Sequence, residues 1–176
     1  MRRQRDERRQ AGQSLLEFAL VIPIFLAMLL GMVDLGRAIW ANNAVANAAR
    51  EAARFAAVHG GAKGQPCPVG PLNPARETAP PASASCPYPS PSKESVRETA
   101  RGFAIAAGVD LTIEVCYGVN CSGDTDTVDG AGEPATNARG TPVTVRVTSQ
   151  APMIVGSFLG LGPIGVSATS TMLVNF

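Results

Sequence analysis

The most apolar part of the chain extends over residues 15–33, and Glu17 is its only charged residue. These 19 residues would span about 28 Å as an α-helix, which is close to the hydrocarbon thickness of a bilayer, about 30 Å. The run therefore predicts a membrane-spanning helix.

The helical pattern continues beyond this run to Gly60 and Gly61, without a proline. Apolar and mostly small residues recur there at spacings close to three and four: Ile39, Ala41, Val45, Ala48, Ala52, Phe55 and Ala56. We predict one helix from about Ser14 to His59, whose projecting half presents a face that another element can approach closely. Asp34 and Arg37 are expected to form an i, i+3 pair just outside the span.

Proline interrupts this pattern in residues 61–91, which contain nine prolines. Proline lacks the N–H donor and fixes φ, so neither a helix nor a central strand is expected there. The segment is predicted to be a long loop, and a Pro-rich linker is the alternative.

Residues 92–176 are predicted to form a helix and an antiparallel sheet of about three strands. The second helix begins near Ser92 and ends near Gly108, with an apolar stripe at Val96, Ala100, Phe103 and Ala107. Apolar residues then alternate with polar ones in residues 111–118, 141–150 and 165–176. The expected fold class is α+β: a long N-terminal helix, a second helix and a sheet with one buried face.

Charge is concentrated in the leader, residues 1–12. The net charge is +1, but five of the 15 basic residues and two of the 14 acidic ones lie in this leader, so the remainder carries 10 basic and 12 acidic residues, a net of −2. Cationic residues beside a span stay on the cytoplasmic side. We therefore expect a cytoplasmic N-terminus and an extracytoplasmic C-terminal domain, and we favour this over a nucleic-acid-binding arm.

Four cysteines, Cys67, Cys86, Cys116 and Cys121, lie on the side expected to be translocated. An even number of cysteines in an oxidising compartment indicates disulfides. A bridge between Cys67 and Cys86 would close the Pro-rich loop, and one between Cys116 and Cys121 would close the mouth of the acidic loop. A zinc site is disfavoured, because the chain has no CxxC motif and a single histidine, His59.

The acidic loop, residues 124–133, contains Asp124, Asp126, Asp129 and Glu133. Clustered oxygen ligands suit calcium, but the spacing does not match an EF-hand loop, so solvated turn residues are the favoured interpretation and no cofactor is predicted.

The apolar segment 153–165 is short for a second span and contains glycine and proline. We expect it to be buried or interfacial, with a contact between subunits as one interpretation.

The sequence favours a non-enzymatic protein. No phosphate-binding glycine loop, dinucleotide fingerprint or nucleophile motif is present. The single histidine, His59, is expected to sit at the helix C-terminus, where it interacts favourably with the helix dipole.

Glu17 is the exceptional residue of the span. A carboxylate at the bilayer centre costs about 2.5 to 3.5 kcal/mol, and ionisable residues in a span are often functional. Because Glu17 lies near the edge of the run, two interpretations remain: a functional carboxylate, or a side chain in the cytoplasmic headgroup region.

An Arg-rich leader, Gly12, Glu17 five residues later and then an apolar helix together resemble the type IV prepilin signal. The wider segment is similar to the TadE-like family of pseudopilins of the tight-adherence (Flp) pilus apparatus. The matching positions are Glu17 with Phe18, Pro23, Gly31, Gly36 with Arg37, and the run from Asn47 to Ala57.

This resemblance implies cleavage between Gly12 and Gln13 by a prepilin peptidase, which would make Glu17 the fifth residue of the mature chain. Glu17 would then pair with the terminal ammonium of a neighbouring subunit during assembly. Pro23 would bend or loosen the span, although an ordinary tolerated proline is equally compatible with the sequence.

The favoured function is a structural or assembly subunit of a Tad-type pilus, with a pilin-like fold and a single span in the cytoplasmic membrane. Its expected partners are the prepilin peptidase, other pilin subunits, the assembly platform and the membrane, without nucleic acid. One alternative is an uncleaved, membrane-anchored extracytoplasmic binding or adhesion module. Another is a secreted protein with a removable signal sequence.

Overall fold

The computed structural model describes residues 2–61, 67–71, 93–104, 111–158, 160 and 162–175. Most of the predicted Pro-rich loop, including Cys86, lies outside these residues, and so does Ala107. The chain divides into two compact units, Met1–Ala38 with Pro152–Ile164, and Ile39–Ala151 with Gly165–Phe176. The predicted leader and domain limits at residues 12, 60 and 91 stay predictions.

The first helix, α1, extends over Arg2–Val58. It begins about twelve residues before the predicted start, because the arginines and glutamines of the leader are good helix formers and no proline precedes Pro23. At its C-terminus, the N–H of Asn175 donates to the carbonyl of Ala57 at 2.9 Å. The end of α1 is thus capped by the C-terminal residues of the chain.

In the second unit, the buried face of α1 consists almost entirely of small residues: Ala41, Val45, Ala48, Ala49, Ala52, Ala53, Ala56 and Ala57. The predicted face is confirmed except at Ile39, which is 55% exposed, and at Phe55, which is only partly buried. Ile39 precedes Ala41 by two residues, which places it about 160° away around the helix axis. Small side chains on this face allow other elements to pack close to the helix backbone.

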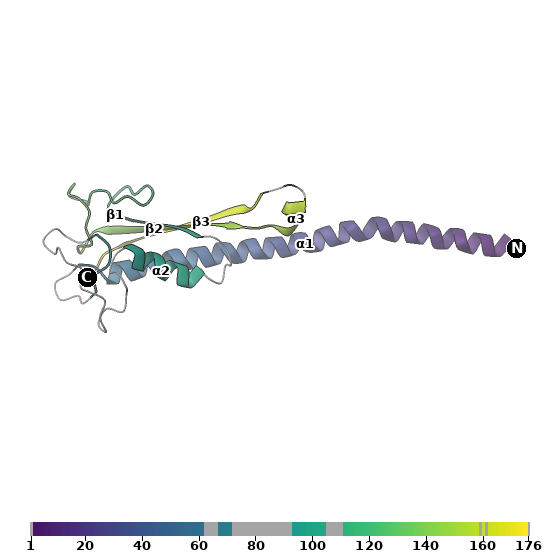
Figure 1. Cartoon of the computed structure of the whole chain (residues 1–176), viewed down its shortest axis with the longest axis horizontal. Helices are drawn as coiled ribbons and strands as arrows, with labels where there is room; N and C mark the ends of the chain where they lie inside the picture. The colour runs from purple at the N-terminus through teal and green to yellow at the C-terminus, as the bar shows by residue number, and fades with distance from the viewer. Residues whose placement is uncertain are drawn as a thin grey trace. The chain divides into compact units, whose positions relative to one another are not determined.

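Three strands form one sheet in the order β1-β2-β3: β1 is Leu111–Tyr117, β2 is Pro142–Ala151 and β3 is Ile164–Leu173. β1 and β2 are antiparallel, with Ile113 opposite Val147. Between β2 and β3, Thr144 and Thr171 share a hydrogen bond of 2.9 Å between their hydroxyls. The predicted antiparallel sheet and the α+β class are confirmed (Figure 1).

The alternating apolar residues of the strands face the core of the second unit. Val115, Val143, Val145 and Val147 are fully buried and belong to the same cluster as the small face of α1. The period of two therefore correctly predicted which face of the sheet is buried.

The second helix, α2, extends over Lys93–Ala104 and lies along the C-terminal part of α1 (Figure 1). Val96, Ala100 and Ala104 are buried in the core. Phe103 was predicted to belong to this apolar stripe, but it is 52% exposed and lines a shallow groove with Phe55 and His59. Its ring therefore does not fill the core.

Tyr117 anchors the short segment 67–71 to the sheet. Its side chain is fully buried, and its hydroxyl donates to the carbonyl of Val69 at 3.5 Å. The adjacent Gly70 has φ of 95°, and a Cβ built on it would lie 2.4 Å from Cζ of Tyr117. Burial raises the pKa of the Tyr117 phenol above its ordinary value. The ring therefore requires a glycine at position 70.

Candidate functional site

The N-terminal half of α1 exposes its apolar side chains. Within Leu15–Val58, an 18-residue window has a mean hydropathy of 2.4, and none of it is buried. Leu16, Phe18 and Phe25 are among the exposed residues. Among the described residues, this is the one helix long and apolar enough to cross a membrane, by length and composition.

The residues of the predicted prepilin signal lie within α1. Gly12 is helical, and the side chains of Gln13 and Glu17 are exposed. Positions 13 and 17 are four residues apart and therefore lie on the same face of the helix, about one turn apart. Over the described part of the chain, Glu17 has no ion pair and no side-chain hydrogen bond. Its carboxylate is accessible to a partner, and its assembly role stays a prediction.

Pro23 lies inside α1 and does not end it. The helix continues for 35 further residues to Val58, so the segment after the proline remains helical. The bend that Pro23 was predicted to cause stays a prediction.

Asp34 has other partners than the sequence predicted. It is only 4% exposed, and its two oxygens accept the backbone N–H groups of Ile154 at 2.9 Å and Val155 at 2.7 Å. The predicted contact with Arg37 is not an ion pair in the described structure. The carboxylate instead caps a short helix 120 residues away, because charged acceptors bind unpaired N–H groups at helix starts.

That short helix, α3, extends over Ile154–Phe158 within the apolar segment 153–165. Gly156 is buried, but Phe158 is 92% exposed and Ile154 and Ile164 are also exposed. The segment was predicted to be buried or interfacial, and most of its described apolar side chains are not buried. In the same unit, Gly31, Leu35, Met153 and Val155 help to line an apolar pocket of about 350 Å³.

Cys116 and Cys121 form a disulfide, with their Cα atoms 5.9 Å apart. The bridge joins the end of β1 to the loop that follows it, which is the position predicted from the sequence. Cys67 is buried and disulfide-bonded, and Cys86 lies outside the described residues.

The first two carboxylates of the acidic loop, those of Asp124 and Asp126, accept backbone N–H groups of β1. Asp124 accepts the N–H of Val115 at 2.7 Å, and Asp126 accepts the N–H of Tyr117 at 2.9 Å. Since β1 pairs with β2 on its other side, these carboxylates occupy donors on the free edge of the sheet. The interpretation as solvated turn residues is wrong for this pair.

Cations from α2 neutralise the same carboxylates. Lys93 contacts Asp126 at 3.2 Å, and Arg97 forms an ion pair with Asp124. With their charge balanced and their oxygens bound to backbone N–H groups, the two aspartates are arranged to close the sheet edge rather than to coordinate calcium.

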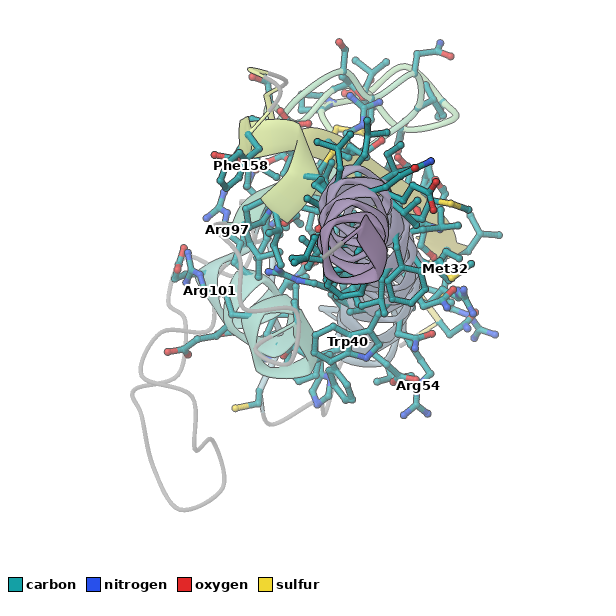
Figure 2. All side chains as sticks on the ribbon, turned by 90° about the vertical axis from the view of Figure 1, so that its right-hand side faces the viewer. Met32, Trp40, Arg54, Arg97, Arg101 and Phe158 are labelled. Atoms are coloured by element: carbon teal, nitrogen blue, oxygen red, sulfur yellow. A yellow bond between two sulfur atoms is a disulfide. The ribbon has the colours of Figure 1, made fainter. Side chains whose placement is uncertain are left out.

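Glu94 joins the two arginines of α2. Hydrogen bonds from Arg101 and then Arg97 lower the pKa of Glu94. The ion pairs run along the exposed surface of α2, and Figure 2 shows Arg97 and Arg101 projecting from that helix. Their role is to stabilise α2 and its contact with the acidic loop.

His59 follows the end of α1, as predicted. Its Nδ1 lies 2.8 Å from the carbonyl oxygen of Phe55, and the centroids of the two rings are 4.2 Å apart, with the ring planes tilted by 33°. The carbonyl of His59 accepts the N–H of Val69 at 2.8 Å. These contacts give the histidine a structural role at the helix end.

Comparison with known proteins found a similarity for the N-terminal part of the chain. Residues 12–54 match the family model described as TadE-like protein. No curated protein and no solved structure matches the chain. The matched segment contains Gly12, Glu17 and Pro23 together with the exposed apolar part of α1. The chain therefore contains an N-terminal segment, residues 12–54, that is similar to the TadE-like family.

Proposed function

We propose that this chain is a non-enzymatic structural or assembly subunit of a Tad-type pilus, a pseudopilin or minor pilin. One observation carries the proposal: the TadE-like segment coincides with the exposed apolar part of α1, where the run 15–33 contains a single carboxylate, Glu17, near its start. A helix of this kind suits a subunit that is stored in a bilayer and then packs against other apolar helices.

Maturation by a prepilin peptidase between Gly12 and Gln13 would prepare the helix for that transfer. Gly12 has no side chain to obstruct a protease at the membrane face. Cleavage removes the five arginines that hold the N-terminus in the cytoplasm, and it creates an ammonium group at Gln13.

Glu17 would act after cleavage. In a bundle of apolar helices, its carboxylate can pair with the Gln13 ammonium of a neighbouring subunit, so that two charges in an apolar environment neutralise each other. Removal of one partner from such a pair typically costs about 3 to 5 kcal/mol. The pair would therefore favour one register between subunits.

The N-terminus of the mature protein tests maturation. Mass spectrometry of the protein isolated from the cell envelope should find Gln13 as the first residue, and Gly12→Ala should leave the leader attached. An intact Met1 in the wild-type protein would contradict maturation and support an uncleaved binding module. A terminus beyond residue 33 would indicate a removable signal sequence.

The assembly role is tested with Glu17→Gln and Glu17→Ala, which should insert normally but reduce co-purification with pilus components. Glu51→Ala is the matched control, because Glu51 is a carboxylate of the same helix that pairs with Arg54 at 3.0 Å. Normal assembly of both Glu17 variants would disprove the pairing.

A further inference from the structure

The start of α3, at Ile154 and Val155, is held beside the end of the predicted span. The carboxylate of Asp34 follows the apolar run directly and accepts the backbone N–H groups of Ile154 and Val155. Asp34 thereby fixes the start of α3 at the level of the helix where the run of apolar residues ends. Both parts belong to the same compact unit.

Apart from Ser157, the described side chains of residues 153–158 are apolar, and those of Ile154 and Phe158 are exposed. Phe158, at the end of α3, is the most exposed of its large hydrophobic residues, and Figure 2 shows it at the outer side of that helix. No charged residue occurs between Gln150 and the end of the chain. Exposed apolar surface of this kind marks a contact with a membrane or another protein.

The position along α1 favours a membrane. The run 15–33 is about as long as the hydrocarbon core is thick, so Asp34 would lie at the boundary between hydrocarbon and headgroups. α3 would then lie among the headgroups, where short apolar segments with aromatic residues bind.

We infer that α3, Ile154–Phe158, is a second membrane contact, an interfacial anchor that inserts Phe158 into the outer surface of the bilayer that α1 spans. Asp34 is its positioning residue. The anchor would fix the rotation and depth of α1, which a single helix in lipid leaves free. The inference rests on the membrane-spanning part of the proposed function and is independent of cleavage and of pilus assembly.

Depth-dependent fluorescence quenching tests this anchor in the full chain. Trp40, the only tryptophan, is first replaced with phenylalanine, and Phe158→Trp then introduces a single indole. In vesicles that contain lipids brominated at shallow or deep acyl positions, the new indole should be quenched severalfold more by the shallow bromines, with blue-shifted emission. Phe103→Trp in the same background is the control and should be quenched by aqueous iodide.

Two results would overturn the inference. Efficient quenching of the Phe158→Trp indole by iodide, without quenching by bromolipids, would place the segment in water. Blue-shifted emission that resists both quenchers would place it in a protein contact. Resistance to alkaline carbonate extraction separately shows that α1 spans the membrane. In protein that resists extraction, either quenching result therefore contradicts the interfacial anchor and leaves the span of α1 unaffected.

Asp34→Ala in the Phe158→Trp background tests the positioning role. Without the cap, the preference for shallow bromines should fall severalfold, whereas Asp34→Asn, which keeps one acceptor, should retain part of it. An unchanged depth profile in Asp34→Ala would show that Asp34 does not position α3.

Discussion

Replacement of Asp34 with alanine should release α3 from α1 without unfolding either unit. The wild-type carboxylate accepts two backbone N–H groups, at 2.9 Å from Ile154 and at 2.7 Å from Val155. A hydrogen bond to a charged group contributes about 1.5 to 3 kcal/mol, and loss of an N-cap side chain typically costs about 1 kcal/mol. Alanine is the best helix former, so α1 itself should not be weakened.

The expected loss is smaller than the sum of two full bonds, because water can reach the freed N–H groups when α3 opens. A local destabilisation of about 2 to 4 kcal/mol corresponds to an opening equilibrium that is about 30 to 1000 times more favourable. Hydrogen–deuterium exchange of the full chain in lipid nanodiscs should therefore accelerate in peptides that cover residues 152–158. Peptides from β1 and β2 should keep their protection.

Arg37→Ala provides the matched control, since Arg37 is an exposed residue on the same helix, one turn from Asp34. It should leave exchange at residues 152–158 unchanged, and Asp34→Asn should fall between wild type and Asp34→Ala. Unchanged exchange in Asp34→Ala would refute the capping argument. Equal acceleration in Arg37→Ala would attribute the effect to the general charge of the region.

Three further predictions concern the second unit. Gly70→Ala should lower the free energy of unfolding, measured by urea titration, by about 2 kcal/mol or more, because Gly70 has positive φ and the new Cβ would overlap the buried ring of Tyr117. Gly130→Ala is the control, because a Cβ at position 130 meets no neighbouring atom within 4 Å. The double variant Cys116→Ser, Cys121→Ser should have a free energy of unfolding lower by about 2 kcal/mol in the chain-entropy model, because the bridge closes a loop with a sequence separation of only 5. A variant as stable as the wild type would contradict this prediction. Burial raises the pKa of Tyr117, so the folded state keeps the phenol proton where the unfolded chain ionises. The contribution of Tyr117 to stability should therefore be constant below about pH 10 and fall by up to about 1.4 kcal/mol per pH unit above it. Tyr117→Phe should remove that part of the alkaline slope in detergent-solubilised protein, and an identical slope in the variant would disprove it.

Much of the fold could be predicted because its signals are local. The period of two in β1 and β2 identified the buried valines, and the spacing of small residues identified the core face of α1. The errors occurred where a residue's environment depends on its neighbours in space. Ile39 matched an apolar pattern but lies on the far side of the helix, and Phe103 matched a stripe but lines an open groove.

In the candidate site, too, local features could be predicted from the sequence and contacts between distant residues could not. Gly12, Glu17 and the apolar helix were recognisable from consecutive residues, and the family match covers this segment. The contacts of Asp34 could not be predicted, because its i, i+3 neighbour Arg37 is the obvious local partner. Its true partners become available only when a segment 120 residues away returns to the same helix.

The sequence by itself determined that the chain has an apolar helix able to span a membrane, a projecting helix with a small-residue face, and three strands with one buried face. Composition and periodicity suffice for these features, because each depends on residues within a few positions of one another. Only the tertiary structure decided where the carboxylates bind: Asp34 at the start of α3, and Asp124 and Asp126 at the free edge of β1. A carboxylate can accept from any donor within reach, and chain folding determines which donors come within reach.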